Sequence, residues 1–216
     1  MASGALHLGA SAGARAVCVL VHGRGQSPEE MQSHILARLD APGVAFVLPR
    51  APGNVWYAAR AVDPLTPETR VALAKAIDHL AGDIAAARAA HPGLPLVLAG
   101  FSQGACLSLE YAFAGLPPPQ ALVAFTGCRV GVLSDDRPHA LPAGLPVYLT
   151  GADADPWIPV TAFAEAALEL GQARARLRCD LFPGRPHEAT GTEIEMLRTV
   201  LADLVSGKTP GMAAPR

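Results

Sequence analysis

The sequence predicts a single α/β domain in which a mostly parallel β-sheet carries helices on both faces. Two observations predict this fold. Continuous apolar runs of strand length alternate with amphipathic helical stretches along almost the whole chain, and Gly, Pro or capping residues separate them. Strands buried on both faces read as unbroken apolar runs, and alternating strands and helices build parallel sheets. The 216 residues fit one domain, and half of them are hydrophobic, which is ample for a buried core.

The elements follow one another at short intervals. A helix is expected to begin at Pro28, because Ser27 and Glu30 form a capping box. Another begins after Thr66 and ends before Pro92. Residues 206–216 predict a loose tail. The expected strands are 16–21, 44–48, 94–99, 121–125, 146–149 and 176–182, and the remaining helices are 103–115, 160–170 and 192–205.

Composition excludes several classes of protein. The net charge of −2 gives no electrostatic footprint for nucleic acid. The apolar runs are far shorter than the roughly 20 residues that span a bilayer, so stable membrane insertion is not expected. Residues 1–14 lack the pattern of a secretory signal. The four cysteines are scattered without metal-ligand spacing, which favours free thiols in the cytoplasm and no metal site.

The strongest functional signal is Gly-Phe-Ser-Gln-Gly at residues 100–104. It follows the expected strand 94–99 and opens a helix. A serine at such a sharp turn needs strained backbone angles, and Gly100 and Gly104 remove the side chains that would collide there. The turn lifts the Ser102 hydroxyl toward the helix N-terminus, where free N–H groups favour negative charge. We interpret Ser102 as a nucleophile; the alternative is a tightly packed or phosphate-holding turn.

A serine nucleophile needs a histidine as base and a carboxylate that orients it. On this kind of sheet the chain order is serine, acid, histidine. Two histidines follow Ser102. His139 lies in a Pro-rich loop, whereas His187 lies between the last expected strand and the last helix, which is the expected place. We therefore assign the base to His187, with a structural surface histidine as the alternative.

Two aspartates compete for the role of the acid. Asp153 and Asp155 both lie in the loop after the strand 146–149. Asp155 precedes Pro156, which stiffens the loop and favours Asp155. Chemistry alone does not dismiss Asp153.

The tetrahedral intermediate of ester hydrolysis needs two donors for its oxyanion. The backbone N–H of Gln103 follows the nucleophile directly, and that of Arg24 lies in the Gly-rich turn after the first strand. That turn could instead only cap the strand. Trp56 and Tyr57 are candidate substrate-binding residues that wall a pocket, or else they pack under their loop.

With these residues assembled, the chain resembles the phospholipase/carboxylesterase family of α/β-hydrolases, which includes the acyl-protein thioesterases. The resemblance covers about residues 16–205 and implies that the aspartate before Pro, here Asp155, is the acid. One departure is Thr150, where the family often has histidine. The motifs in family order are 22–25, 49–52 with 56–57, 100–104, 155–159 and 184–188.

The resemblance implies hydrolysis of esters or thioesters without metal or organic cofactor, and often a homodimer. We expect a carboxylesterase for small to medium acyl chains that acts on small-molecule esters. A thioesterase or lysophospholipase for long chains is the alternative, and a non-catalytic binding module is a further one. No large cap domain is expected, because only residues 53–65 and 128–145 are left over between the elements, and we expect them to line an open cleft.

Overall fold

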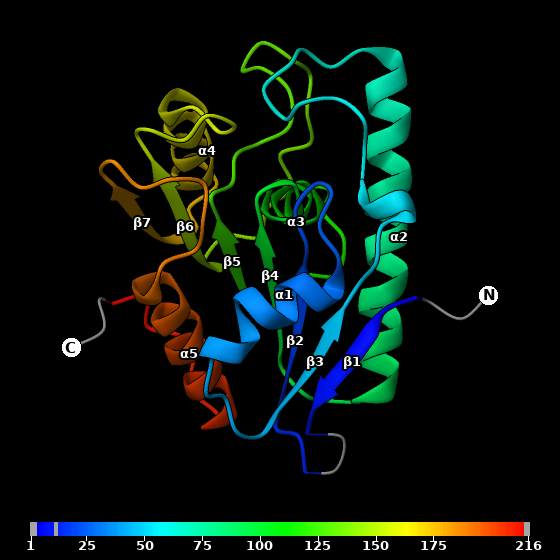
Figure 1. Cartoon of the computed structure of the whole chain (residues 1–216), viewed down its shortest axis with the longest axis vertical. Helices are drawn as coiled ribbons and strands as arrows, with labels where there is room; N and C mark the ends of the chain where they lie inside the picture. The colour runs from blue at the N-terminus through cyan, green and yellow to red at the C-terminus, as the bar shows by residue number, and fades with distance from the viewer. Residues whose placement is uncertain (1–3, 11–12, 214–216) are drawn as a thin grey trace.

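A computed structural model of the chain describes residues 4–10 and 13–213. These residues form one seven-stranded sheet in the order β1-β3-β2-β4-β5-β6-β7, in which every neighbouring pair except β1 and β3 is parallel (Figure 1). The predicted α/β fold is therefore confirmed. The strands are β1 (Leu6–Gly9), β2 (Ala16–Val21), β3 (Val44–Leu48), β4 (Leu96–Phe101), β5 (Ala121–Phe125), β6 (Pro146–Ala152) and β7 (Arg176–Phe182).

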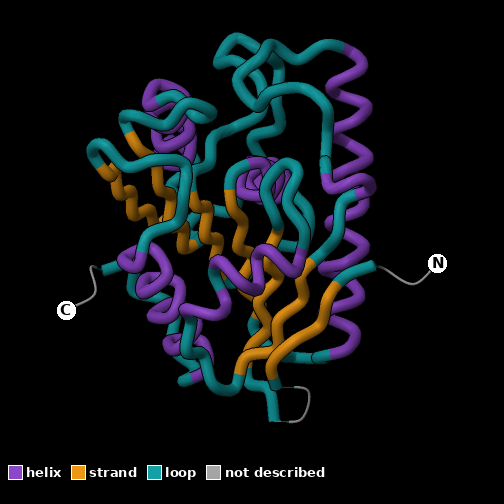
Figure 2. The backbone as a smooth tube through the Cα atoms, viewed as in Figure 1, coloured by secondary structure: helices purple, strands orange, loops and turns teal. Residues whose placement is uncertain are grey.

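Helices cover both faces of the sheet (Figure 2). Val17, Val19 and Val21 of β2 pack in the core cluster that contains α2, α3 and α4, while Cys18 and Leu20 pack with α1 and α5. Alternate side chains of a strand point to opposite faces, so one apolar run supplies two cores. The helices are α1 (Pro28–His34), α2 (Pro67–Ala90), α3 (Gln103–Phe113), α4 (Val160–Gln172) and α5 (Gly191–Val205), with short 3₁₀ turns η1 (Leu36–Arg38) and η2 (Pro52–Asn54).

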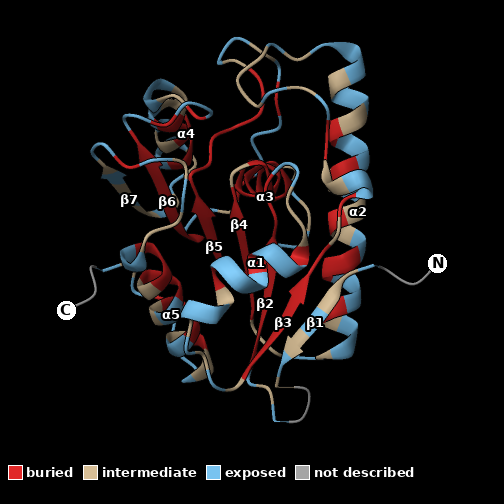
Figure 3. Ribbon diagram, viewed as in Figure 1, coloured by how far each residue is buried: buried red, intermediate tan, exposed pale blue. Residues whose placement is uncertain are grey.

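The structure differs from the sequence-based expectation at both ends of the chain. Strand β1 was not predicted; it is a half-buried edge strand, so it lacks the apolar run of the central strands (Figure 3). The expected loose tail has no helix or strand in residues 208–213, but it makes contacts with the domain. Pro210 is buried and its carbonyl accepts a hydrogen bond from Arg176 at 3.0 Å, and Met212 packs against the core. Residues 214–216 lie outside the described residues.

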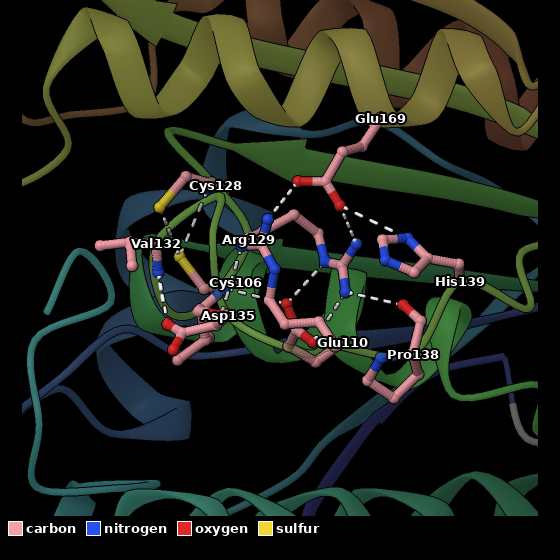
Figure 4. A network of polar contacts seen from close by, with 11 residues as sticks. Cys106, Glu110, Cys128, Arg129, Val132, Asp135, Pro138, His139 and Glu169 are labelled. Atoms are coloured by element: carbon pink, nitrogen blue, oxygen red, sulfur yellow. Dashed lines mark hydrogen bonds and ion pairs between the residues drawn. The ribbon is translucent and has the colours of Figure 1, made fainter. Parts of the chain in front are cut away.

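A buried network of charges holds the segment after β5 (Figure 4). Arg129 donates to Glu110 of α3 at 2.7 Å and to Glu169 of α4 at 2.6 Å, and its guanidinium lies 3.8 Å from the centre of the Phe113 ring. Arg137 also donates to Glu169, at 2.5 Å. A buried ion pair is strongly destabilised when one partner is removed, because the other charge stays without compensation. This network therefore ties residues 128–139 to α3 and α4.

We expect Arg129→Ala to lower the free energy of unfolding by about 3–5 kcal/mol, because Glu110 and Glu169 would keep buried charge without this partner. The measurement is equilibrium denaturation in urea. Arg198→Ala is the matched control, because its pair with Glu195 is exposed, and it should change stability little. Equal losses in the two variants would contradict the assigned role of the network.

Candidate active site

Ser102 stands at a sharp turn between β4 and α3. Its backbone has φ 54° and ψ −119°, and its N–H donates to the carbonyl of Phe125 at 2.9 Å. A Cβ at Gly100 would lie 2.5 Å from the carbonyl of Gly104, and a Cβ at Gly104 would lie 2.2 Å from the carbonyl of Val21. The two glycines of the motif are therefore required sterically, as the sequence predicted.

A chain of hydrogen bonds joins the three residues that the sequence singled out. The hydroxyl of Ser102 lies 2.8 Å from Nε2 of His187, and Nδ1 of His187 lies 2.7 Å from Oδ2 of Asp155. The histidine comes from the loop between β7 and α5, and the aspartate from the loop after β6. Three segments that are distant in sequence thus meet at the carboxyl edge of the parallel strands.

Asp155 is held in its ionised form. Burial favours the neutral acid, but hydrogen bonds from His187 and from the backbone N–H groups of Ile158 and Trp157 outweigh it and keep the pKa of Asp155 below its usual value. The two N–H groups bind Oδ1 at 3.0 and 2.8 Å, which leaves Oδ2 for the imidazole. The competing Asp153 accepts instead from the N–H of Gly184 at 2.6 Å, so it supports the loop of His187 without touching the ring.

The loop of His187 is anchored by a second buried ion pair. Arg185 donates to both carboxylate oxygens of Glu193 on α5, at 2.9 and 2.8 Å, and to the hydroxyl of Thr126 at 3.0 Å. The hydroxyl of Thr150 donates to Glu193 at 2.5 Å and accepts from the N–H of Thr126 at 3.0 Å. This bridge accounts for Thr150, where the sequence departs from the family it resembles. The ion pair therefore holds the loop that carries His187.

The two residues expected to donate to an oxyanion are Gln103, directly after Ser102, and Arg24, in the turn after β2. Neither the backbone N–H of Gln103 nor that of Arg24 donates to another residue within the described ranges. We call the sharp turn of residues 100–104 the elbow. Gly23 allows the turn after β2 to lie close to it, since a Cβ at Gly23 would lie 3.2 Å from Cβ of Ser102. The side chain of Gln103 accepts from the N–H of Trp56 at 3.1 Å and donates to the carbonyl of Tyr57 at 2.8 Å. It thereby fixes the neighbouring loop.

Trp56 does not line the cavity beside Ser102, so its expected role as a substrate-binding residue is corrected. Its indole N–H donates to the carbonyl of His22 at 2.9 Å, and its ring packs against those of His22 and His79. His22 accepts from the N–H of Ala51 through Nε2 at 3.0 Å. Burial lowers the pKa of His22, which keeps this acceptor neutral. Trp56 therefore packs under its loop, which was the alternative interpretation.

A cavity of about 510 Å³ opens beside Ser102, and Tyr57 lines it as predicted. Trp157 also lines it, which the sequence did not indicate; its side chain is 61% exposed and it follows Asp155 by two residues. Residues 128–145 were expected to line the cleft, and none of them lines this cavity. The lining residues are Gly23, Arg24, Gln26, Tyr57, Arg60, Ala61, Phe101, Ser102, Gln103, Cys106, Trp157, Ile158 and His187.

In the part of the chain that the structure describes, metal binding would require a cluster of ligating side chains, and membrane crossing would require a long apolar helix. No group of three His, Cys, Asp or Glu side chains is placed to hold a metal ion there. Within the same residues, no helix combines the length and the apolar character needed to cross a membrane.

The fold is that of an α/β-hydrolase, and the described residues form no large cap domain. Comparisons with known proteins identify the family within this class. The model of the family described as phospholipase/carboxylesterase matches residues 9–205. The chain therefore belongs to the phospholipase/carboxylesterase family.

Solved structures agree with this assignment. The chain is 27% identical to a phospholipase/carboxylesterase from Dyadobacter fermentans, over 93% of this chain and 97% of that one, with a TM-score of 0.81. It is 24% identical to esterase PE8 over 92% and 97% of the two chains, with a TM-score of 0.77. For acyl-protein thioesterase 2 of Zea mays the identity is 16%, the coverage 94% and 99%, and the TM-score 0.73. The last two likenesses show the fold alone.

Proposed function

We propose that the protein is a serine carboxylesterase in which Ser102 is the nucleophile, His187 the general base and Asp155 the orienting acid. The observation that carries the proposal is the unbroken chain of hydrogen bonds, at 2.8 and 2.7 Å, from the serine hydroxyl through the imidazole to the carboxylate. The serine end of these hydrogen bonds lies in the lining of a cavity that has room for a small ester. A non-catalytic binding module would have no need for this geometry.

The reaction follows from the positions of these groups. Nε2 of His187 removes the proton of Ser102 as its oxygen attacks the ester carbonyl, and the protonated imidazole then donates that proton to the leaving alcohol. Asp155 holds Nδ1–H and stabilises the imidazolium. The N–H groups of Gln103 and Arg24 donate to the oxyanion of the tetrahedral intermediate. Water hydrolyses the acyl-enzyme by the same steps, with the base again taking the proton.

The size of the acyl group is set by the shape of the cavity. Trp157, Ile158 and Tyr57 give it apolar walls, and it is open to solvent on one side, where Trp157 is exposed. Residues 128–139, which could have formed a second wall, are tied to α3 and α4 instead. An open cavity buries little of a long alkyl chain, so each added CH₂ gains less than the roughly 0.8 kcal/mol of full burial. We therefore propose esters of short to medium acyl chains.

Asp155 and Asp153 contact different groups, so their substitution should affect activity differently. Asp155→Asn should lower kcat by about 10⁴-fold, because it removes the charge that fixes the His187 tautomer. Asp153→Asn should lower kcat less than about tenfold, because Asp153 contacts Gly184 and not the imidazole. Steady-state kinetics on a p-nitrophenyl ester measures both. The opposite ranking would move the acid to Asp153.

We expect kcat/KM for p-nitrophenyl esters to peak at acyl chains of about two to six carbons and to decline beyond, because the open cavity buries added methylenes poorly. A series of chain lengths at fixed detergent gives the profile. A maximum at about twelve carbons or more would contradict the short-chain proposal and favour a long-chain thioesterase or lysophospholipase.

A further inference from the structure

The cavity beside Ser102 carries an unbalanced charge. Arg24 and Arg60 both line it, and no Asp or Glu occurs among the described residues of its lining. The walls between them are mostly apolar, from Trp157, Ile158 and Ala61. A pocket with apolar walls and a few charged groups uses those groups to orient and select its ligand. The side chains of the lining thus include two cations and no carboxylate, which favours an anionic ligand.

Arg24 is a fixed cation. Its guanidinium donates to the carbonyl of Ala58 at 2.9 Å and to the carbonyl of Ala59, so it cannot swing away from the cavity. Neither carbonyl carries a full charge that would neutralise it, and no ion pair of Arg24 occurs within the described part of the chain. Its guanidinium therefore keeps a positive charge at the loop that carries Tyr57, Arg60 and Ala61 on the edge of the cavity.

Arg60 is exposed, as Arg24 is, but its guanidinium has fewer contacts. Its backbone N–H donates to the carboxylate of Asp63 at 3.3 Å, which closes a short turn. The guanidinium of Arg60 makes no ion pair or hydrogen bond with any residue that the structure describes. Its donors are thus free for a ligand, and a guanidinium binds a carboxylate with two parallel hydrogen bonds.

The position of these cations indicates which part of the ester they contact. The leaving oxygen must receive a proton from Nε2 of His187. A second cavity of about 450 Å³ shares Phe101 and His187 with the first and lies against α1, so an alcohol that takes its proton from His187 can leave on that side. That cavity is lined by charges of both signs, including Arg38 and Glu188, so it does not select an anion. The acyl group then lies in the first cavity, with Arg24 and Arg60.

We propose that this site takes esters whose acyl part carries a carboxylate, that is, monoesters of short dicarboxylic acids. Arg60 binds the carboxylate and Arg24 supplies a second positive charge beside it. The inference rests on the proposed function, since it names the substrate class of the same site. Apolar contacts with Trp157 and Ile158 hold the methylenes between the ester and the carboxylate.

The test compares two p-nitrophenyl esters of equal chain length, the glutarate monoester, which is anionic, and the pentanoate, which is neutral. Arg60→Gln should lower kcat/KM for the anionic ester by about three- to tenfold, mainly through KM, because an exposed cation in a cleft contributes modestly. It should leave the neutral ester almost unchanged. Arg60→Lys should keep part of the preference, and added salt should weaken it in the wild type.

Arg15→Gln is the matched control, because it removes the same charge from an exposed residue that does not line the cavity. Isothermal titration with free glutarate supplies a readout without turnover, and Arg60→Gln should weaken this binding while Arg15→Gln should not. Equal effects of Arg60→Gln on both esters, or unchanged glutarate binding, would overturn the inference. If glutarate binding depends on Arg60 but neither ester is cleaved, the anion site stands and the proposed function fails.

Discussion

The backbone at Ser102 passes from β4 into α3 with a positive φ, and this turn is possible only because three neighbouring positions carry no side chain. Gly100, Gly104 and Gly23 would each bring a Cβ within about 3 Å of another atom of the elbow or of the turn after β2. Strain of this kind costs of order 1–3 kcal/mol and persists where the surroundings enforce it. Here β2, β4 and β5 are fully buried and supply that enforcement.

The elbow would be of little use if the loops of His187 and Asp155 were free to move. Each is held by polar groups that are themselves buried. Arg185 and Glu193 pair beneath the histidine loop, and Asp155 binds two N–H groups of its own loop. The side chain of Gln103 ties the elbow to the loop of Tyr57 in the same manner. Rigid strand ends thus position Ser102, His187 and Asp155, while loops line the cavity beside them.

Much of this arrangement could be predicted from the sequence, because it depends on local patterns. Apolar runs gave the central strands, and the capping residue Thr66 gave the start of α2. The order serine, acid, histidine placed three residues that the structure brings within hydrogen-bonding distance. What sequence reasoning missed depends on three-dimensional packing. The ring of Trp56 packs against His22 and His79, and these contacts turn it away from the cavity. The C-terminal residues are held by the hydrogen bond from Arg176 to Pro210. The sequence alone does not show that Arg60 lines the cavity beside Ser102, because this depends on the three-dimensional position of its loop.

Covalent labelling would show whether the Ser102 hydroxyl is an activated nucleophile. The wild-type protein would be treated with a fluorophosphonate, which phosphonylates activated serines, and the adduct located by peptide mass spectrometry. We expect one adduct, on Ser102, in the wild-type protein. It should be absent in Ser102→Ala and form much more slowly in His187→Ala, while both variants remain folded. A folded wild-type protein without an adduct on Ser102, or a Ser102→Ala variant that still hydrolyses esters at near the wild-type rate, would contradict it.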